Sequence, residues 1–203
     1  MRQQRSIIVR AALSMAWWFA CSLADAACFA ASGPDTVALL ELYTSARCPE
    51  CPAAERRLAE LRSRYPGLIA VSVRVGDSSY AGRRLSPRQR MALLHRPHLL
   101  LQGTEVALGE IEPSIARITA QPARARLALE RTASEVLATA QAPDGELYLG
   151  LHEGPQVGDW IGPLEVHGRL VERRAVPPKS GVIAFIQDRR TRVVLQALRL
   201  SAC

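Results

Sequence analysis

The chain has 203 residues, of which 48% are hydrophobic and 22% charged, so it is long and apolar enough to bury a sizeable core. Its formal net charge is +7, and nearly all of the positive charge is arginine, since Lys179 is the only lysine. A nucleic-acid surface needs clustered positive charge with interleaved aromatic side chains, whereas only 5% of these residues are aromatic. We therefore expect no nucleic-acid partner. We interpret the scattered arginine pairs as solvated surfaces: Arg56-Arg57, Arg83-Arg84, Arg173-Arg174 and Arg189-Arg190.

Residues 1–26 have the three parts of a secretory signal peptide. A basic region with three arginines is followed by an apolar region, residues 11–23, and by the cleavage site Ala24-Asp25-Ala26. No later stretch approaches the roughly 20 uncharged apolar residues that a membrane-spanning helix needs. We expect a periplasmic or secreted protein that does not insert into a membrane after cleavage. The oligomeric state stays open.

Five cysteines are present, and one of them, Cys21, lies inside the predicted signal peptide. The four that remain are an even set that can be fully paired in an oxidising compartment. Cys48 and Cys51 are suggested as a pair by adjacency, which leaves Cys28 and Cys203 to form a structural disulfide between the two ends of the mature chain. The alternative is that Cys28 and Cys203 are unpaired thiols.

The motif Cys48-Pro49-Glu50-Cys51 follows a nearly continuous apolar run, residues 37–43, in which Glu41 is the only charged residue. Such a run is typical of a central strand that is buried on both faces. A helix is predicted over residues 53–64, and a helix N-terminus stabilises a nearby thiolate. The motif therefore indicates redox chemistry, although a structural disulfide or a metal site is compatible with the same spacing.

Strands and helices alternate in the rest of residues 27–122. A strand is predicted at 68–75, a polar loop at 76–84, a helix at 86–95 that begins with a capping box, a strand at 98–101, a tight turn at Gln102-Gly103, a strand at 104–108 and a helix at 112–120. We expect a first domain over residues 27–122 and a C-terminal β domain over residues 123–203, where strand-like segments alternate with turn signals.

The predicted order, βαβαββα, resembles that of a thioredoxin core. We therefore expect an α/β fold with a thioredoxin-like core, followed by a small antiparallel β-sandwich-like domain. Pro97, directly before the third strand, falls where the thioredoxin fold carries a cis-proline beside the cysteines. That resemblance implies that Pro97 presents backbone groups to a partner chain.

The mature chain as a whole resembles the bacterial secreted family called "domain of unknown function 1223", whose members are thioredoxin-like. Five segments carry the resemblance: Leu40-Glu41-Leu42-Tyr43-Thr44-Ser45, Cys48-x-x-Cys51-Pro52, Arg88-Gln89-Arg90, residues 182–188 and residues 194–198. The sequence departs from the family pattern at residues 74–79, which are shortened and lack its aromatic residues. It departs again at Gly158-Asp159-Trp160, where the family usually has Gly-Glu-Asn.

Thiol-disulfide exchange is the leading functional hypothesis, which makes the protein a possible oxidoreductase without a cofactor. Cys48 is expected to attack, because Arg47 favours its thiolate, and Cys51 to resolve the mixed disulfide. The partners would be protein thiols or disulfides in the periplasm. If the helix starts at Cys51 with Pro52 in its first turn, Cys48 lies about one turn from the helix dipole and is activated less.

Two alternatives remain open. Cys48, Cys51 and His98, with His95 as a further candidate, form a donor set suited to copper or zinc. In the competing interpretation, His95 is an exposed helix-end residue and His98 faces solvent. The other alternative is a non-enzymatic binding module in which the cysteine pair is a purely structural disulfide.

Overall fold

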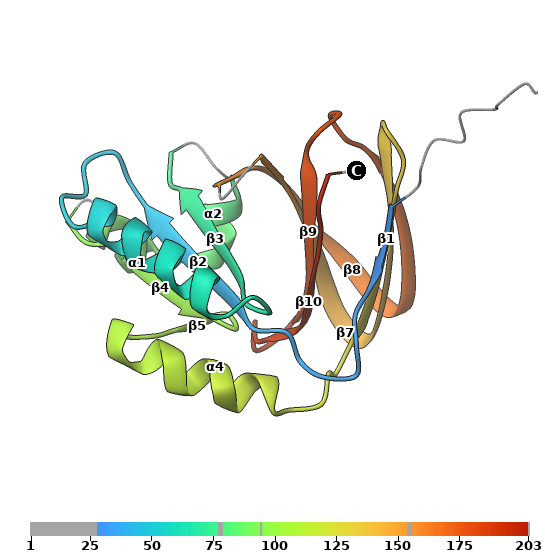
Figure 1. Ribbon diagram of the computed structural model, residues 1–203, viewed down its shortest axis with the longest axis horizontal. Coiled ribbons are helices and arrows are strands. Elements are labelled where there is room, and N and C mark those ends of the chain that lie inside the picture. The colour runs from blue at the N-terminus through green and yellow to red at the C-terminus, as the bar shows by residue number, and fades with distance from the viewer. Residues whose placement is uncertain (1–27, 77–78, 94, 154–155, 203) are drawn as a thin grey trace, which may run out of the picture.

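The computed structural model describes residues 28–76, 79–93, 95–153 and 156–202 (Figure 1). The predicted signal peptide and Cys203 lie outside these ranges. None of the helices within them combines the length and the apolar character that crossing a membrane requires.

Strands and helices alternate between residues 28 and 119. In chain order the elements are β1 (Cys28–Ala31), β2 (Leu39–Thr44), α1 (Cys51–Arg64), β3 (Ile69–Arg74), α2 (Ser79–Arg84), α3 (Pro87–Ala92), β4 (His98–Leu101), β5 (Thr104–Glu105), the 3-10 helix η1 (Leu108–Glu110) and α4 (Ile111–Thr119). Every residue of β2 is buried, in keeping with its apolar sequence. Ser86 caps α3 as predicted, because its side chain accepts a hydrogen bond from the Gln89 amide. Part of the expected polar loop, however, forms α2.

Strands account for nearly all of the second half of the chain. They are β6 (Arg126–Arg131), β7 (Glu135–Glu153), β8 (Gln156–Ala175), β9 (Gly181–Asp188) and β10 (Val194–Leu200). The segment Pro143-Asp144-Gly145, which predicts a turn between two short strands, instead lies inside β7. It coincides with a register shift between Ala142 and Gly145. Before this shift β7 pairs with β6, and after it β7 pairs with β9. The irregularity therefore redirects one long strand and does not end it.

All of these strands belong to one ten-stranded mixed sheet. The hydrogen-bonded order is β1-β6-β7-β8-β3-β2-β4-β5, and β9 and β10 branch from β7. The predicted fold class is therefore wrong: the chain forms a mostly stranded mixed sheet, and not a thioredoxin-like core followed by a small antiparallel β-sandwich. The order of short segments in a sequence does not record which strands pair. Here β3 and β8 join at Ser72 and Gln156, so the pairing continues from one half of the chain into the other.

Three hydrophobic clusters fill the interior. One packs α1 and α4 against β2 and β4, and another lies among β6 to β10. The third combines residues of β2 and β3 with residues of β7, β9 and β10, including Tyr43, Tyr148 and Phe185. In Figure 1 the helices gather at one end of the molecule, while β7 to β10 form the other end with β1 beside them. The third cluster therefore ties the helical end to the stranded end.

Candidate functional site

A disulfide bond joins Cys48 and Cys51, whose Cα atoms are 5.4 Å apart. Cys48 lies in the turn between β2 and α1, and Cys51 is the first residue of α1. The turn is held by backbone hydrogen bonds from the Cys48 amide to the Ser45 carbonyl (3.3 Å) and from the Cys51 amide to the Cys48 carbonyl (3.4 Å). In addition, the Ser45 hydroxyl donates to the Leu93 carbonyl at 2.6 Å. The loop that carries the cysteines is thus anchored to the end of α3.

Both cysteines are almost covered, with 5% of Cys48 and 4% of Cys51 exposed, whereas Arg47, Pro49 and Glu50 are exposed. Helix α1 starts at Cys51 with Pro52 in its first turn, and its N-cap residue, Glu50, makes no side-chain capping bond. The helix dipole therefore acts more closely on Cys51 than on Cys48. Arg47 is the charged neighbour of Cys48 along the chain.

Pro97 is half-buried, and the peptide bond before it is trans. Pro97, the candidate for the cis-proline of a thioredoxin fold, therefore does not have that geometry; within the described residues the cis peptide bond lies at Gly162-Pro163. Pro97 and Glu50 nevertheless line the same groove, which has a volume of about 390 Å³ and includes Leu99 and Leu108. The structure thus places Pro97 on a groove that reaches the middle of the Cys-x-x-Cys motif.

His98 does not face solvent, because only 3% of it is exposed. Its Nδ1 lies 3.0 Å from Oε1 of Glu105 on the neighbouring strand β5. His95 is exposed, as expected. No group of three or more His, Cys, Asp or Glu side chains in the described ranges is arranged to hold a metal ion. The alternative metal site of Cys48, Cys51 and His98 is therefore not assembled.

A buried ionic cluster, which the sequence-based interpretation did not identify, is centred on Glu41 in β2. The Glu41 carboxylate is fully buried and accepts hydrogen bonds from the hydroxyls of Tyr43 (2.7 Å) and Tyr80 (2.5 Å). It also forms an ion pair with Arg84, the last residue of α2, which in turn donates to Gln187 in β9. The cluster therefore links β2, α2 and β9.

Arg84 is buried, so the interpretation of Arg83-Arg84 as a solvated pair is wrong for this residue. Burial lowers the pKa of Arg84, but the adjacent charge of Glu41 outweighs this effect and the net pKa is raised. Burial, reinforced by the charge of Glu41, raises the pKa of both Tyr43 and Tyr80 well above the ordinary value. Both hydroxyls therefore stay protonated as donors. The one signal in the sequence was Glu41 itself, a lone charge in an otherwise apolar strand.

Stacked aromatic rings surround this cluster. The Tyr80 and Trp160 rings are nearly parallel with centroids 4.1 Å apart, and Phe185 stacks on Tyr148 at 5.0 Å. The Arg84 guanidinium carbon lies 5.2 Å from the Phe185 ring centroid, within the range of a cation-π interaction. These contacts hold α2 against the sheet and support β2, the strand that leads to Cys48.

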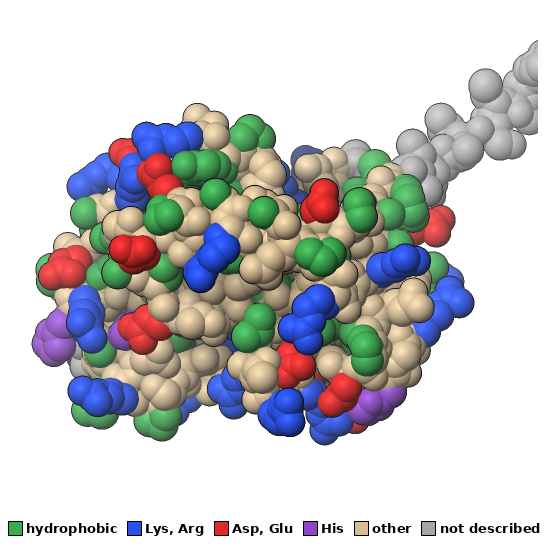
Figure 2. All heavy atoms as spheres, turned by 90° about the horizontal axis from the view of Figure 1, so that it is seen from below, with side chains coloured by type: hydrophobic (Ala, Val, Ile, Leu, Met, Phe, Trp, Pro, Cys, Tyr) green, Lys and Arg blue, Asp and Glu red, His purple; other side chains and the backbone are tan. Residues whose placement is uncertain are grey.

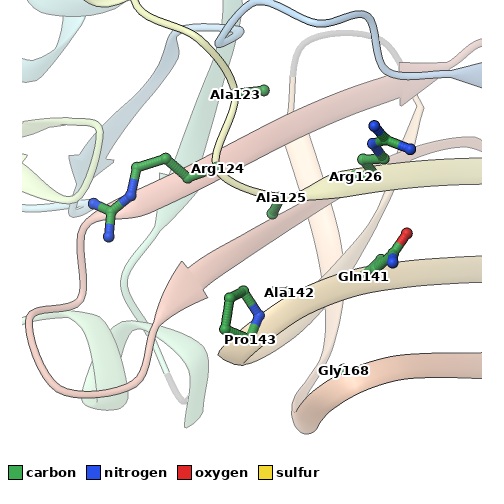
Figure 3. Close-up of a pocket in the computed structure, with 8 residues that line it drawn as sticks. All are labelled: Ala123, Arg124, Ala125, Arg126, Gln141, Ala142, Pro143 and Gly168. Atoms are coloured by element: carbon green, nitrogen blue, oxygen red, sulfur yellow. The ribbon is translucent and has the colours of Figure 1, made fainter.

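Figure 3 shows another surface cavity, of about 490 Å³, lined by residues 123–126, 141–143 and Gly168. The side chains of Arg124 and Arg126 project in opposite directions, so their charges do not converge on one point. No cysteine or histidine lines this cavity. It offers no reactive group and is separate from the Cys48–Cys51 pair.

Figure 2 shows acidic and basic side chains interspersed over one face of the molecule, without a continuous region of one sign. On this face the structure offers no extended basic surface.

Cys28 begins β1, which pairs with β6. Its predicted partner Cys203 lies outside the described residues, so the Cys28–Cys203 disulfide stays a prediction.

No family model matches this chain, and no curated protein matches it. A crystal structure of a protein from Agrobacterium tumefaciens, solved as a structural genomics target, resembles it with a TM-score of 0.63 and 15% sequence identity. The match covers 85% of this chain and 97% of that one. At this identity the likeness shows a shared fold alone. The resemblance to the "domain of unknown function 1223" family stays a prediction.

Proposed function

We propose that the protein takes part in thiol-disulfide exchange through Cys48 and Cys51. The observation that carries this proposal is the disulfide itself, placed between the C-terminal end of a buried strand and the first residue of a helix. Arg47, the neighbour of Cys48 along the chain, favours a thiolate at Cys48, and the N-terminus of α1 favours one most strongly at Cys51. Cysteine pairs in such electropositive surroundings are more easily deprotonated than ordinary thiols.

The exchange starts from the reduced pair and a disulfide in a partner protein. The Cys48 thiolate attacks one partner sulfur, which forms a mixed disulfide and releases the other partner sulfur as a thiolate. The Cys51 thiolate then attacks the Cys48 sulfur, which closes the Cys48–Cys51 bond and releases the second partner thiolate. Two electrons pass from the protein to its partner. The same steps in reverse oxidise a partner dithiol, so the relative reduction potentials set the direction.

The groove lined by Glu50, Pro97 and Leu108 supports this proposal, because it reaches the motif from the side of β4 and β5. Two exposed residues, Pro49 and Glu50, separate the cysteines and give a partner chain access to the turn. We place the exchange in the periplasm or outside the cell, on the strength of the signal-peptide features in residues 1–26.

The reduction potential of the Cys48–Cys51 pair tests the proposal. The protein is equilibrated with glutathione buffers of graded potential, alkylated, and analysed by mass spectrometry of the peptide that contains both cysteines. We expect a potential above about −300 mV, together with turnover on a protein disulfide. A lower potential without turnover would identify the bond as structural and support the binding-module alternative.

A matched pair of variants tests the assigned roles. Cys51→Ser should accumulate a mixed disulfide through Cys48, because the resolving thiolate is missing, whereas Cys48→Ser should accumulate much less. Trapping with equal efficiency in both variants would contradict the assignment of Cys48 as the attacking residue. Non-reducing electrophoresis with a labelled partner peptide measures the two yields.

A further inference from the structure

The C-terminal half of β8, residues 168–175, is an open edge of the sheet. On one side it pairs with β7 in an antiparallel register that has no shift over these residues. On the other side, within the described residues, β8 pairs with β3 at Gln156 and with no other strand. Such an edge presents backbone donors and acceptors to which another chain can bind.

The other edges of the sheet are shorter or more buried. β1 and β5 end the hydrogen-bonded order of strands, but they contain only four and two residues. β10 pairs on one side with β9, and all of its residues except Arg199 are buried. In the C-terminal half of β8, by contrast, every second residue is exposed: Arg169, Val171, Arg173 and Ala175. This half of β8 is therefore long enough and exposed enough to pair with a further strand.

The hydrogen-bond pattern shows which residues of this edge have free backbone groups. The Val176 amide donates to the Ser134 carbonyl at 2.8 Å, in the same register as the β7–β8 pairs that precede it. Along an antiparallel pair, residues that bond to the neighbouring strand alternate with residues that do not. The even-numbered residues of the edge therefore bond to β7. The odd-numbered residues from 169 to 175 direct their amides and carbonyls to the open side.

The charges of this edge are complementary to those of a second copy of the same edge. Glu172 and Arg174 lie on one face of the strand, where their side chains form an ion pair at 2.7 Å. When two copies pair antiparallel about a twofold axis at Arg173, Glu172 of each copy lies opposite Arg174 of the other. Opposite charges directly across a strand pair stabilise it, and like charges destabilise it. An axis at Glu172 would set this carboxylate against its own copy, so the charges favour the axis at Arg173.

The residues on the other face of the strand fit the same arrangement. Val171 is 50% exposed, which is unusual for a large hydrophobic side chain of this protein, and it lies opposite Ala175 of the second copy. The two Arg173 side chains meet at the axis, but each is paired with Glu135 of its own chain at 3.0 Å. Each contact occurs twice, as a twofold axis requires.

We propose that the protein forms a homodimer in which the C-terminal halves of two β8 strands pair antiparallel about a twofold axis at Arg173. The ten-stranded sheets of the two copies then join into one continuous sheet. A single pair of strand edges is small compared with the roughly 1,600 Å² of a standard protein interface, so the dimer dissociates at micromolar concentrations. The proposal is independent of the thiol-disulfide exchange, since neither Cys48 nor Cys51 contributes to this edge.

Sedimentation equilibrium over a series of protein concentrations tests for the dimer. We expect a reversible monomer–dimer equilibrium in the wild type. Glu172→Arg should weaken it by about tenfold or more, because the substitution places like charges opposite each other twice in a symmetric dimer. The charge swap Glu172→Arg/Arg174→Glu should restore dimerisation to within about threefold of the wild type, since both oppositely charged pairs return. The control Glu130→Arg makes the same change of charge at an exposed position of β6 and should leave the equilibrium within about twofold.

Introduced cysteines test the register of the two strands. In Arg173→Cys the two new side chains lie opposite each other, with Cα atoms about 5.5 Å apart, which is within the range of a disulfide. In Val171→Cys, the matched control on the same edge, they lie four residues apart along the strand, a distance of about 13 Å. Non-reducing electrophoresis after mild oxidation should therefore show a crosslinked dimer for Arg173→Cys and not for Val171→Cys. A protein that stays monomeric up to about 1 mM, a dimer that Glu172→Arg leaves intact, or equal crosslinking of the two cysteine variants would overturn the proposal.

Discussion

Glu41 is unusual among the residues of this protein because a fully buried carboxylate is tolerated only with several partners. Arg84 supplies the opposite charge, and the hydroxyls of Tyr43 and Tyr80 donate to the same Oε1 atom. Substituting one partner of a buried ion pair leaves the other charge buried without compensation. Replacing both partners by apolar residues leaves no buried charge. The two kinds of substitution therefore have different expected costs.

We predict that Arg84→Met lowers the free energy of unfolding by about 3–5 kcal/mol, because it strands the Glu41 charge. The double variant Glu41→Leu/Arg84→Met should be more stable than Arg84→Met alone. Urea denaturation of the wild type, of Glu41→Leu, of Arg84→Met and of the double variant gives the four free energies of unfolding that a double-mutant cycle needs. Tyr43→Phe is the control and should cost only about 1 kcal/mol, the usual value of one hydrogen bond. Simple additivity of the two single substitutions would contradict a coupled pair.

At the scale of elements, the turn of the β4–β5 hairpin fixes the position of the hairpin against β10. Gln102 and Gly103 both have positive φ, 54° and 82°, as a tight turn requires. The Gln102 carbonyl accepts a hydrogen bond from the Val194 amide at 3.0 Å, which joins the hairpin to the start of β10. A Cβ atom at Gly103 would collide with the Arg192 carbonyl oxygen, so the hairpin and the β9–β10 connection approach each other through this glycine.

Gly103→Ala should therefore destabilise the protein by more than about 1 kcal/mol, because it combines a strained φ with a backbone collision. Gly33→Ala is the control, since nothing lies within 4 Å of a Cβ there and its φ is not positive. Thermal unfolding followed by circular dichroism measures the stability of both variants relative to the wild type. Equal effects of the two substitutions would argue against a close approach at Gly103.

A second contact between elements joins α1 to α4. Glu112 accepts hydrogen bonds from Arg57 (2.5 Å) and Arg64 (2.8 Å) of α1, and from the Tyr65 hydroxyl at 3.1 Å. Slight burial raises the pKa of Glu112, but the Tyr65 hydrogen bond and the two arginine charges outweigh it and the net pKa is lowered. A lowered pKa in the folded state means that the interaction contributes stability above the ordinary carboxyl pKa, about 4.3, and loses it as the pH falls through the lowered value.

Glu112→Gln should consequently be less stable than the wild type at neutral pH, and the difference should shrink as the pH falls below about 4. Urea denaturation over a series of pH values measures this difference. Glu130→Gln is the control, because Glu130 is exposed and has no ion pair among the described residues. Its difference in stability from the wild type should change much less with pH. A difference that grows towards acid pH would reverse the assigned sign.

At the scale of the whole molecule, Phe185 lies where the two ends meet. It is fully buried in β9, stacks on Tyr148 and packs edge-on against Trp160 at 5.7 Å. Its cluster also contains Leu39 and Tyr43 of β2. Because this core is shared by strands from both halves of the chain, neither half has a complete interior without the other.

The chain should therefore unfold in a single transition, and Phe185→Ala should shift that transition by about 3–5 kcal/mol without splitting it. Near-ultraviolet circular dichroism reports the aromatic cluster, and far-ultraviolet circular dichroism reports the sheet. Their urea curves should coincide in both proteins. Two separate transitions in the wild type would contradict a shared core.

The sequence allowed the individual elements to be predicted better than their assembly. The buried character of β2, the apolar face of α1 and the cap at Ser86 depend on neighbouring residues, so periodicity and capping rules detect them. The pairing of β3 with β8 depends on residues far apart in the chain, and no local pattern encodes it. The fold class was wrong for that reason.

The candidate site shows the same division. Adjacency was enough to pair Cys48 with Cys51. His98 contacts Glu105 across the β4–β5 hairpin. Arg84 is buried with Glu41 and Gln187 as partners, and both of these residues are far from Arg84 in the sequence. The trans bond before Pro97 is likewise set by the surrounding structure.

Gln196, in β10, has consequences for the order in which the molecule can form. Its side-chain amide accepts a hydrogen bond from the Val37 amide at 2.9 Å and donates to the Asp35 carbonyl at 3.0 Å, just before β2. The ribosome adds Gln196 159 residues after Val37. A nascent chain therefore lacks the last partner of its first buried strand until synthesis is almost complete. We therefore expect this connection, and with it the complete fold, to form only after the C-terminal strand has been synthesised.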